Sequence, residues 1–185
     1  AKCGIRGTWQ ARITFKDVMV PRKNLLHEEG KGLNVALTCL NYGRCTLSAG
    51  MLGGAKRAKD QGIKWAQTRY QFGKPLASFQ LIQAKLAEMV SEITKAQLVQ
   101  WRLGKLKEAG KIRPQHVSLA KRNNVHQALK IARTARDMLG ANGITAEYQC
   151  MRHMCNLESV YTYEGTHSIH TLILGQDVTG IAAYS

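Results

Sequence analysis

The segment best suited to chemistry is Tyr161-Thr162-Tyr163-Glu164-Gly165-Thr166-His167. It places the Glu164 carboxyl group among aromatic side chains, in a turn at the start of a predicted helix. A carboxyl group shielded from water beside aromatic rings holds a proton more readily, which suits proton transfer near neutral pH. Thr166 can cap the following helix, whose free N–H groups favour a carboxylate or a phosphate. Glu164 is therefore either a general base or an ordinary acidic residue at a helix start.

A metal site at the same place is disfavoured by the spacing of its ligands. Glu164, His167 and His170 follow one another at three-residue intervals, so on a helix the first and the last lie about 120° apart. The chain also lacks an H-E-x-x-H pattern. We therefore expect no metal ion in this segment.

Two loops could hold a phosphorylated, aromatic ligand. Arg69-Tyr70-Gln71-Phe72-Gly73-Lys74-Pro75-Leu76 joins a cation, an aromatic ring and a loop glycine. Gly140-Ala141-Asn142-Gly143 could present backbone N–H groups to a phosphate. It lacks the Lys-Ser/Thr pair of a P-loop. An ordinary polar loop remains the alternative for both.

The composition narrows the class of protein. The 185 residues carry a net charge of +15, and 44% of them are hydrophobic, so the chain can form a core and should have an anionic partner. No apolar run reaches eighteen residues, so we expect no membrane span. The five cysteines form no C-x-x-C pair and are expected to be reduced thiols. Basic residues are scattered and aromatics scarce, which argues against nucleic-acid binding.

The elements that must position these residues are mainly helices. Apolar residues at helical spacing predict one long helix from about residue 32 to 69, with a helix broken in two as the alternative. Further helices are predicted after residue 80, before the glycines at 140–143, around residues 147 to 156, and from about 166 to 183. Short connections between long helices favour an antiparallel helical bundle.

The first 28 residues differ from the rest. Residues 8 to 20 alternate apolar and polar side chains and predict a strand, which Pro21 ends. An isolated pair of strands is marginal in water, so the remainder of such a sheet should lie upstream or on a partner. The chain does not begin with Met, and we expect it to be part of a longer protein.

Together, these stretches resemble the acyl-CoA dehydrogenase family, closest to its glutaryl-CoA dehydrogenase branch. The resemblance covers essentially the whole chain. It rests on Leu40-Asn41-Tyr42-Gly43-Arg44, the 69–76 loop, Gln80-Leu81-Ile82-Gln83, Lys121-Arg122-Asn123-Asn124, Ala135-Arg136-Asp137-Met138-Leu139-Gly140 and Tyr163-Glu164-Gly165-Thr166-His167. It implies that residues 1–28 are the terminal strands of a middle β-domain and residues 29–185 a C-terminal helical bundle domain.

The resemblance also implies a role for each residue. Glu164 matches the base that removes the substrate's α-proton as a hydride passes to the flavin. Residues expected to contact FAD, some of them that of a neighbouring subunit, are Arg69, Phe72, Gln80, Asp137, Met138, Leu139, Gly140, Ala141, Thr166 and Tyr184. Residues expected to contact the acyl-CoA are Leu37, Asn41, Arg44, Tyr163 and Gly165.

The activity that the resemblance implies is oxidative decarboxylation of glutaryl-CoA to crotonyl-CoA and CO2, in a homotetramer that passes electrons to an electron-transferring flavoprotein. The 185 residues alone are expected to be inactive. A short-chain acyl-CoA dehydrogenase or an oxidase that releases no CO2 is the alternative within the family. A non-catalytic helical module with a basic binding face is the alternative outside it. The expected location is the mitochondrial matrix in a eukaryote and the cytoplasm in a bacterium.

Overall fold

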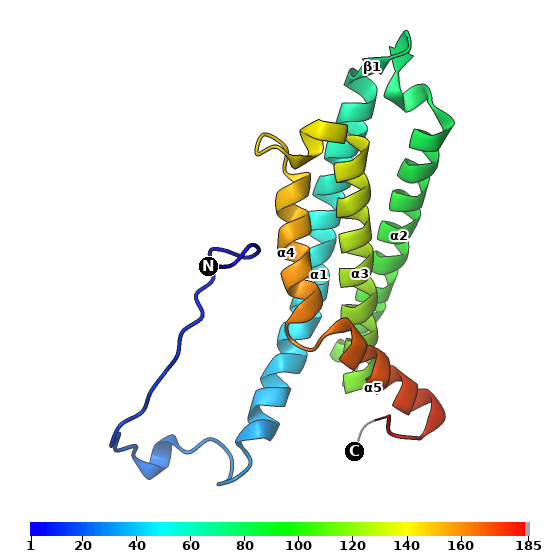
Figure 1. Cartoon of the computed structure of the whole chain (residues 1–185). Helices are drawn as coiled ribbons and strands as arrows, with labels where there is room; N and C mark the ends of the chain where they lie inside the picture. Colours follow the sequence, from blue (N-terminus) through cyan, green and yellow to red (C-terminus); the bar gives the residue numbers. More distant parts are fainter. Residues whose placement is uncertain (184–185) are drawn as a thin grey trace.

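The computed structural model describes residues 1–183 as an elongated helical bundle with an irregular N-terminal arm (Figure 1). The bundle contains α1 (Gly32–Thr68), α2 (Gln80–Glu108), α3 (Pro114–Met138), α4 (Cys150–Thr162) and α5 (His167–Thr179). A small antiparallel hairpin, β1 (Tyr70–Gln71) and β2 (Lys74–Pro75), joins α1 to α2. Short 3-10 turns lie at η1 (Arg22–Asn24), η2 (Leu76–Ser78) and η3 (Gly140–Ile144). The predicted helical bundle is confirmed.

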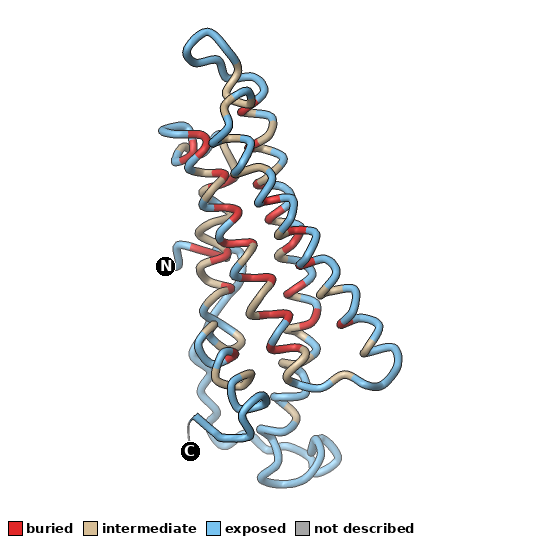
Figure 2. Tube along the Cα trace, turned by 90° about the vertical axis from the view of Figure 1, so that its right-hand side faces the viewer, coloured by how far each residue is buried: buried red, intermediate tan, exposed pale blue. Residues whose placement is uncertain are grey.

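Helix α3 is the centre of the bundle, since α1, α2, α4 and α5 all pack against it. Its contact with α1 is lined by alanines with no exposed surface, which lets the two backbones approach closely. These alanines are Ala55, Ala58 and Ala66 on α1, and Ala128, Ala132 and Ala135 on α3. Figure 2 shows the buried positions running along the inner faces of the helices. The core therefore runs along the length of the bundle and fixes the positions of its two ends relative to each other.

Helix α1 is unbroken from Gly32 to Thr68 in spite of its glycines, so the prediction of one long helix is confirmed. Two of these glycines have a packing role. A Cβ at Gly62 would lie 3.7 Å from Met138 Cε, and a Cβ at Gly43 would lie 3.3 Å from Glu164 Oε1. The bundle and the turn after α4 thus come close to the α1 backbone at these two places.

The predicted strand at residues 8 to 20 is absent, and this prediction was wrong for the chain by itself. The segment is irregular, with Trp9 95% exposed and Phe15 78% exposed. A strand exists only as part of a hydrogen-bonded ladder, and no neighbouring strand pairs with this segment within residues 1–183. Only the start of the arm is attached to the bundle, where the N–H of Ile5 donates to Asn156 Oδ1 on α4 (2.7 Å).

The last two helices differ from their predicted bounds for identifiable reasons. Helix α4 begins at Cys150, because Gln61 Oε1 on α1 accepts from the N–H groups of Gln149 (3.0 Å) and Cys150 (3.1 Å). This capping bond comes from another helix and leaves no local signal in the sequence. Helix α5 stops at Thr179, because Gly180 adopts a left-handed conformation with φ 72° and ends it.

Candidate active site

The turn between α4 and α5 has two consecutive residues with left-handed backbone. Glu164 has φ 54° and Gly165 has φ 88°. A non-glycine residue in this region is strained, and such strain persists only where the surroundings hold it. A side chain at Gly165 would also place its Cβ 2.8 Å from His170 Nε2. This position therefore requires glycine both for its conformation and for space.

Three basic side chains from three different helices hold the carbonyl groups of this turn. Arg44 Nε, on α1, donates to the Glu164 carbonyl oxygen (2.8 Å), and His170 Nε2, on α5, lies 3.2 Å from the same oxygen. Lys121 Nζ, on α3, donates to the carbonyl oxygen of Gly165 (2.7 Å). Helix α5 itself is capped by Thr166, whose hydroxyl accepts from the Ile169 N–H (3.2 Å), as predicted.

The Glu164 carboxylate lies over the backbone of α1 at Gly43, with its oxygens 3.3 and 3.5 Å from where a Cβ would stand. Its Oε2 atom is buried and accepts no hydrogen bond from any group of residues 1–183. A buried carboxylate oxygen without a donor is costly, and natural proteins keep such atoms mainly at sites of chemistry or ligand binding. With no donor bonded to it, this oxygen keeps its lone pairs free to take a proton.

Burial lowers the pKa of all three supporting groups. It lowers the pKa of His170 to about 4, with a further lowering by Lys121 and Arg44, so this ring is neutral at pH 7. A carbonyl oxygen only accepts, so the neutral ring donates through Nε2 and its Nδ1 accepts from the Ser118 hydroxyl (3.1 Å). Burial also lowers the pKa of Lys121 to about 8, assisted by Arg44 and opposed by Glu164. Two cations and one neutral donor thus surround the turn.

The residues predicted to contact the substrate gather near Glu164. Arg44 reaches the Glu164 carbonyl and also donates through Nη1 to Asn41 Oδ1 (3.2 Å). Tyr163 and Gly165 flank Glu164 in the turn, and Tyr163 is 41% exposed. Leu37 lies one turn of α1 before Asn41 and is 42% exposed. All five predicted residues therefore fall at one end of the bundle.

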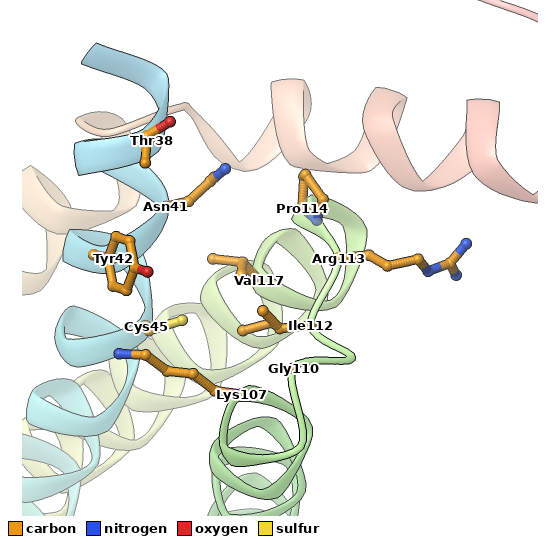
Figure 3. Close-up of a pocket in the computed structure, with 10 residues that line it drawn as sticks. All are labelled: Thr38, Asn41, Tyr42, Cys45, Lys107, Gly110, Ile112, Arg113, Pro114 and Val117. Atoms are coloured by element: carbon orange, nitrogen blue, oxygen red, sulfur yellow. The ribbon is translucent and has the colours of Figure 1, made fainter. Parts of the chain in front are cut away.

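A cavity of about 380 Å³ opens on the other side of Asn41, between α1 and the connection from α2 to α3 (Figure 3). In Figure 3, Lys107 extends across the cavity towards Tyr42, and its ammonium lies 4.5 Å from the centre of that ring. Cys45 lines the wall, and burial raises the pKa of its thiol. Asn41 is thus shared by this cavity and by the Arg44 network.

The predicted cofactor residues divide between the two ends of the bundle. Thr166 lies beside Glu164. The others described by the structure, Arg69, Phe72, Gln80, Asp137, Met138, Leu139, Gly140 and Ala141, lie at the opposite end, where α1 and α3 finish and α2 begins (Figure 1). Helical rise puts roughly 37 Å along α1 between Arg44 and Arg69. Tyr184 lies outside the described residues.

The far end presents a cation and an aromatic ring to solvent. The guanidinium carbon of Arg69 lies 6.0 Å from the centre of the Trp65 ring, and Phe72, at the hairpin tip, is 89% exposed with φ 53°. The side chains of Met138 and Leu139 are buried in the core, so only their backbone can meet a ligand. The exposed Phe72 ring and the Arg69 guanidinium, both at this end of the bundle, are groups that can contact an aromatic, phosphorylated ligand such as FAD.

Sequence reasoning missed three residues at the site: Lys121, His170 as a donor to the turn, and Gly43. Lys121 and His170 act on backbone carbonyl groups, which leave no residue-type pattern, and Lys121 is 44 positions from Gly165. The helical glycines were a usable signal, because an interior helix glycine is costly unless something must come close. Only the folded structure shows that Glu164 is what approaches Gly43.

The described residues contain neither a three-ligand metal cluster nor a membrane-spanning helix. No group of three His, Cys, Asp or Glu side chains is placed to hold a metal ion among residues 1–183. Within the same range, no helix has the length and apolar character needed to cross a membrane. His170 was considered as a metal ligand because of its spacing from Glu164 and His167. It is instead buried, with its Nδ1 atom 3.1 Å from the Ser118 hydroxyl.

Known proteins with related sequences are acyl-CoA dehydrogenases. The short-chain-specific acyl-CoA dehydrogenase of Megasphaera elsdenii is 34% identical over 174 residues, which is 94% of this chain and 45% of that protein. The chain thus spans less than half the length of the curated relatives it matches.

Solved structures of the same family superpose on the bundle. Glutaryl-CoA dehydrogenase from Mycobacterium smegmatis is 50% identical with a TM-score of 0.81, over 83% of this chain and 40% of that chain. Another structure of a glutaryl-CoA dehydrogenase from that organism, 46% identical with the same coverage and TM-score, is in complex with FADH2. Butyryl-CoA dehydrogenase from Megasphaera elsdenii is 35% identical with a TM-score of 0.85, over 89% of this chain and 43% of that chain.

The family model for this part of these enzymes matches most of the chain. It is described as "Acyl-CoA dehydrogenase, C-terminal domain" and aligns with residues 30–179, which span α1 to α5. The match therefore covers the turn with its three basic supports as well as the hairpin end. The chain belongs to the acyl-CoA dehydrogenase family, as its C-terminal helical domain.

Proposed function

We propose that the protein containing this chain is an FAD-dependent acyl-CoA dehydrogenase in which Glu164 is the general base. The observation that carries the proposal is the buried Oε2 of Glu164, which has no hydrogen-bond donor among residues 1–183 although three basic side chains surround its turn. A carboxylate kept free of ion pairs remains able to accept a proton. The membership of the family gives this base its substrate class, an acyl thioester.

The mechanism assigned to this chain is proton removal with stabilisation of the resulting charge. Glu164 Oε2 takes the proton from the carbon next to the thioester carbonyl. Within residues 1–183 the N–H of Glu164 bonds to no acceptor, so it is free to donate to the thioester oxygen as negative charge develops there. Bound FAD would supply the acceptor for the hydride that leaves the neighbouring carbon. Tyr163 and Leu37 shield the acyl group from water.

We further propose that FAD is shared between copies of the chain in a homotetramer. Thr166 lies at one end of the bundle, and the far cluster (Arg69, Phe72, Gln80 and residues 137–141) lies at the opposite end. One FAD molecule beside Glu164 therefore cannot reach the far cluster of the same copy. The far cluster is then available to the cofactor of a neighbouring copy. This arrangement uses every predicted cofactor residue that the structure describes.

The substrate we propose is glutaryl-CoA, which would be oxidised and decarboxylated to crotonyl-CoA and CO2. Support comes from the 50% identity with a glutaryl-CoA dehydrogenase, against 35% with a butyryl-CoA dehydrogenase. The second candidate is a short-chain acyl-CoA dehydrogenase or oxidase without decarboxylation. It is favoured by the curated short-chain-specific relatives, at 34% identity.

The remaining proposals concern the complete protein. Residues 1–28 are proposed to be the last strands of a middle β-domain, whose other strands would pair with the exposed segment from Trp9 to Val20. The electron acceptor is proposed to be an electron-transferring flavoprotein. The location is proposed to be the mitochondrial matrix in a eukaryote or the cytoplasm in a bacterium.

The test uses the complete FAD-loaded protein without oxygen. Glutaryl-CoA and butyryl-CoA are mixed with it separately, and flavin bleaching and CO2 release are followed for the wild type and for Glu164→Gln. The Gln side chain preserves the shape of Glu but is not a base at neutral pH. We expect glutaryl-CoA to bleach the flavin and release CO2, and both signals to disappear in Glu164→Gln.

Other outcomes decide between the alternatives. Bleaching by butyryl-CoA alone keeps the dehydrogenase and removes glutaryl-CoA as substrate. If the substrate bleaches the flavin of Glu164→Gln as fully as that of the wild type, Glu164 is not the base. Failure of both thioesters to reduce the wild-type flavin removes the proposed function as a whole.

A further inference from the structure

Lys121 is a buried ammonium group without a carboxylate partner. It is 1% exposed and lies on α3, the central helix. Its one hydrogen bond among residues 1–183 goes to the carbonyl oxygen of Gly165 (2.7 Å), and no carboxylate in that range forms an ion pair with it. Burying a charge without an ion pair is expensive, and a lysine in a helical core is readily replaced by an apolar residue of similar volume. The position of Lys121 therefore calls for a role.

The role follows from the peptide group that Lys121 holds. Arg44 and His170 both bond to the carbonyl of Glu164, so they fix the peptide unit between Glu164 and Gly165. Lys121 alone fixes the next unit, between Gly165 and Thr166. Gly165 has φ 88°, and glycine can leave this conformation at little cost if its carbonyl is released.

The hydrogen bonds to the Glu164 carbonyl and to the Gly165 carbonyl together fix the geometry of the turn. With the carbonyl groups of Glu164 and Gly165 held, the peptide units on both sides of Gly165 are fixed, directly after Glu164 with its φ of 54°. That conformation directs the carboxylate to the gap at Gly43. If the second peptide unit turns, the start of α5 moves with respect to α1, and the carboxylate loses its place over the helix.

We propose that Lys121 is a positioning residue for Glu164, acting through the Gly165 carbonyl to hold the carboxylate over Gly43 of α1. The proposal rests on the proposed function for its kinetic consequence. A misplacement of about 1 Å in a reacting group can slow a reaction about 100-fold.

The experiment compares Lys121→Met and Lys121→Gln in the complete FAD-loaded protein. Met fills the space with no donor, whereas the shorter Gln keeps a neutral N–H donor. The matched control is Lys130→Met, which makes the same change on the same helix at a half-exposed lysine paired with Glu88. The limiting rate of flavin reduction and the half-saturating thioester concentration are measured separately.

We expect Lys121→Met to lower the limiting rate about 100-fold while the half-saturating concentration stays within about threefold of the wild type. Lys121→Gln should fall between Lys121→Met and the wild type, and Lys130→Met should match the wild type. Loss of substrate affinity with an unchanged rate, or wild-type kinetics in both Lys121 variants, overturns the proposal. If Lys121→Met fails to fold, Lys121→Leu takes its place as the variant without a donor, and a wild-type rate in that variant overturns the proposal just as well.

A second measurement separates this proposal from the proposed function. Amide hydrogen exchange of Tyr163, Ile169 and His170, whose N–H groups are hydrogen-bonded on the two sides of the turn, reports the turn and needs no turnover. Lys121→Met should speed exchange there at least tenfold and leave α1 and the rest of α3 unchanged. If no thioester reduces the wild-type flavin, the proposed function fails, and the exchange result alone then decides whether Lys121 holds the turn.

Discussion

At the level of single residues, the site keeps its cations away from the carboxylate they surround. Arg44 and Lys121 donate to the carbonyl groups of Glu164 and Gly165, and Oε2 of Glu164 has no donor within residues 1–183. A direct ion pair would stabilise the charged form and weaken the base. Support through the backbone fixes the position of the carboxylate without a hydrogen bond to its Oε2 atom.

The space at Gly43 should matter for activity and not for folding. In Gly43→Ala the new Cβ would stand 3.3 Å from Glu164 Oε1, so the carboxylate must shift by a few tenths of an ångström. We expect flavin reduction to slow about tenfold, while α1 gains up to about 1 kcal/mol from the better helix former. Stopped-flow reduction and urea unfolding measure the two effects, and an unchanged rate would show that the gap at Gly43 is dispensable.

His170 should make the fold sensitive to mild acid. Burial, together with Lys121, Arg44 and His167, lowers its pKa to about 4 from the ordinary 6.5. The unfolded chain therefore binds more protons between these values, and stability rises with pH through that window. It should fall by about 2 kcal/mol on going from pH 7 to pH 5.

The measurement for His170 is urea unfolding at both pH values, with His170→Gln for comparison. Gln can still bond to Ser118 or to the Glu164 carbonyl but does not titrate. The variant should lose most of the difference between pH 7 and pH 5. An equal difference in both proteins would assign the acid sensitivity to other groups.

The sequence could predict Glu164 but not its supports. The turn around Glu164 is a contiguous stretch with a carboxylate, aromatic rings, a glycine and a capping threonine, and every one of these has a local signature. Lys121 and His170 bond to main-chain oxygens, and any residue type supplies such an oxygen. Their role depends on which helix faces which, and that is fixed only by packing.

At the level of helices, α1 contains glycines that face no atom of residues 1–183. Gly50 is an exposed interior position of the helix, and a Cβ there would meet no atom within 4 Å. We expect Gly50→Ala to raise the free energy of unfolding by about 0.5–1 kcal/mol, because alanine loses less conformational entropy in a helix. Urea unfolding measures the gain, and the variant should reduce its flavin at the wild-type rate, which makes it the control for Gly43→Ala.

Helices were predictable where the pattern was internal to one segment. The periodic apolar positions of α3, such as Ala128, Ala132 and Ala135, indicate the face that is buried. The start of α4 was misplaced because its capping acceptor, Gln61, lies on α1. The strand at residues 8 to 20 was wrong in this chain because its pattern requires a ladder partner that residues 1–183 do not provide.

At the level of the whole molecule, the division of predicted cofactor residues between two ends makes a prediction about mixed assemblies. The complete protein with Glu164→Gln lacks the base but keeps the cofactor residues at the opposite end of the bundle. The complete protein with Arg69→Ala and Phe72→Ala keeps the base but lacks two of those cofactor residues. Each should be inactive as a pure assembly. If a cofactor is shared between copies, joint refolding should restore activity to roughly a quarter of the wild-type value, because about half of the pairs are mixed and one of the two sites in each mixed pair is complete.

Co-purification with two different tags isolates the mixed assemblies for that measurement. Mixing the two folded proteins without refolding serves as the control, since stable assemblies exchange no copies. Failure of the mixed assemblies to reduce flavin above the parents would mean that each copy holds its cofactor alone.

Because α1 is uninterrupted, it fixes the distance between the Glu164 site and the hairpin end of the bundle. Its 37 residues carry Arg44 about a third of the way along and end just before Arg69, so the helical pitch fixes both the spacing and the rotation between these two positions. Adding or removing one residue would rotate one end against the other by about 100° and would separate Gly43 from Glu164. The distance between the two ends can therefore change only in steps that also restore the rotation, of about seven or eleven residues.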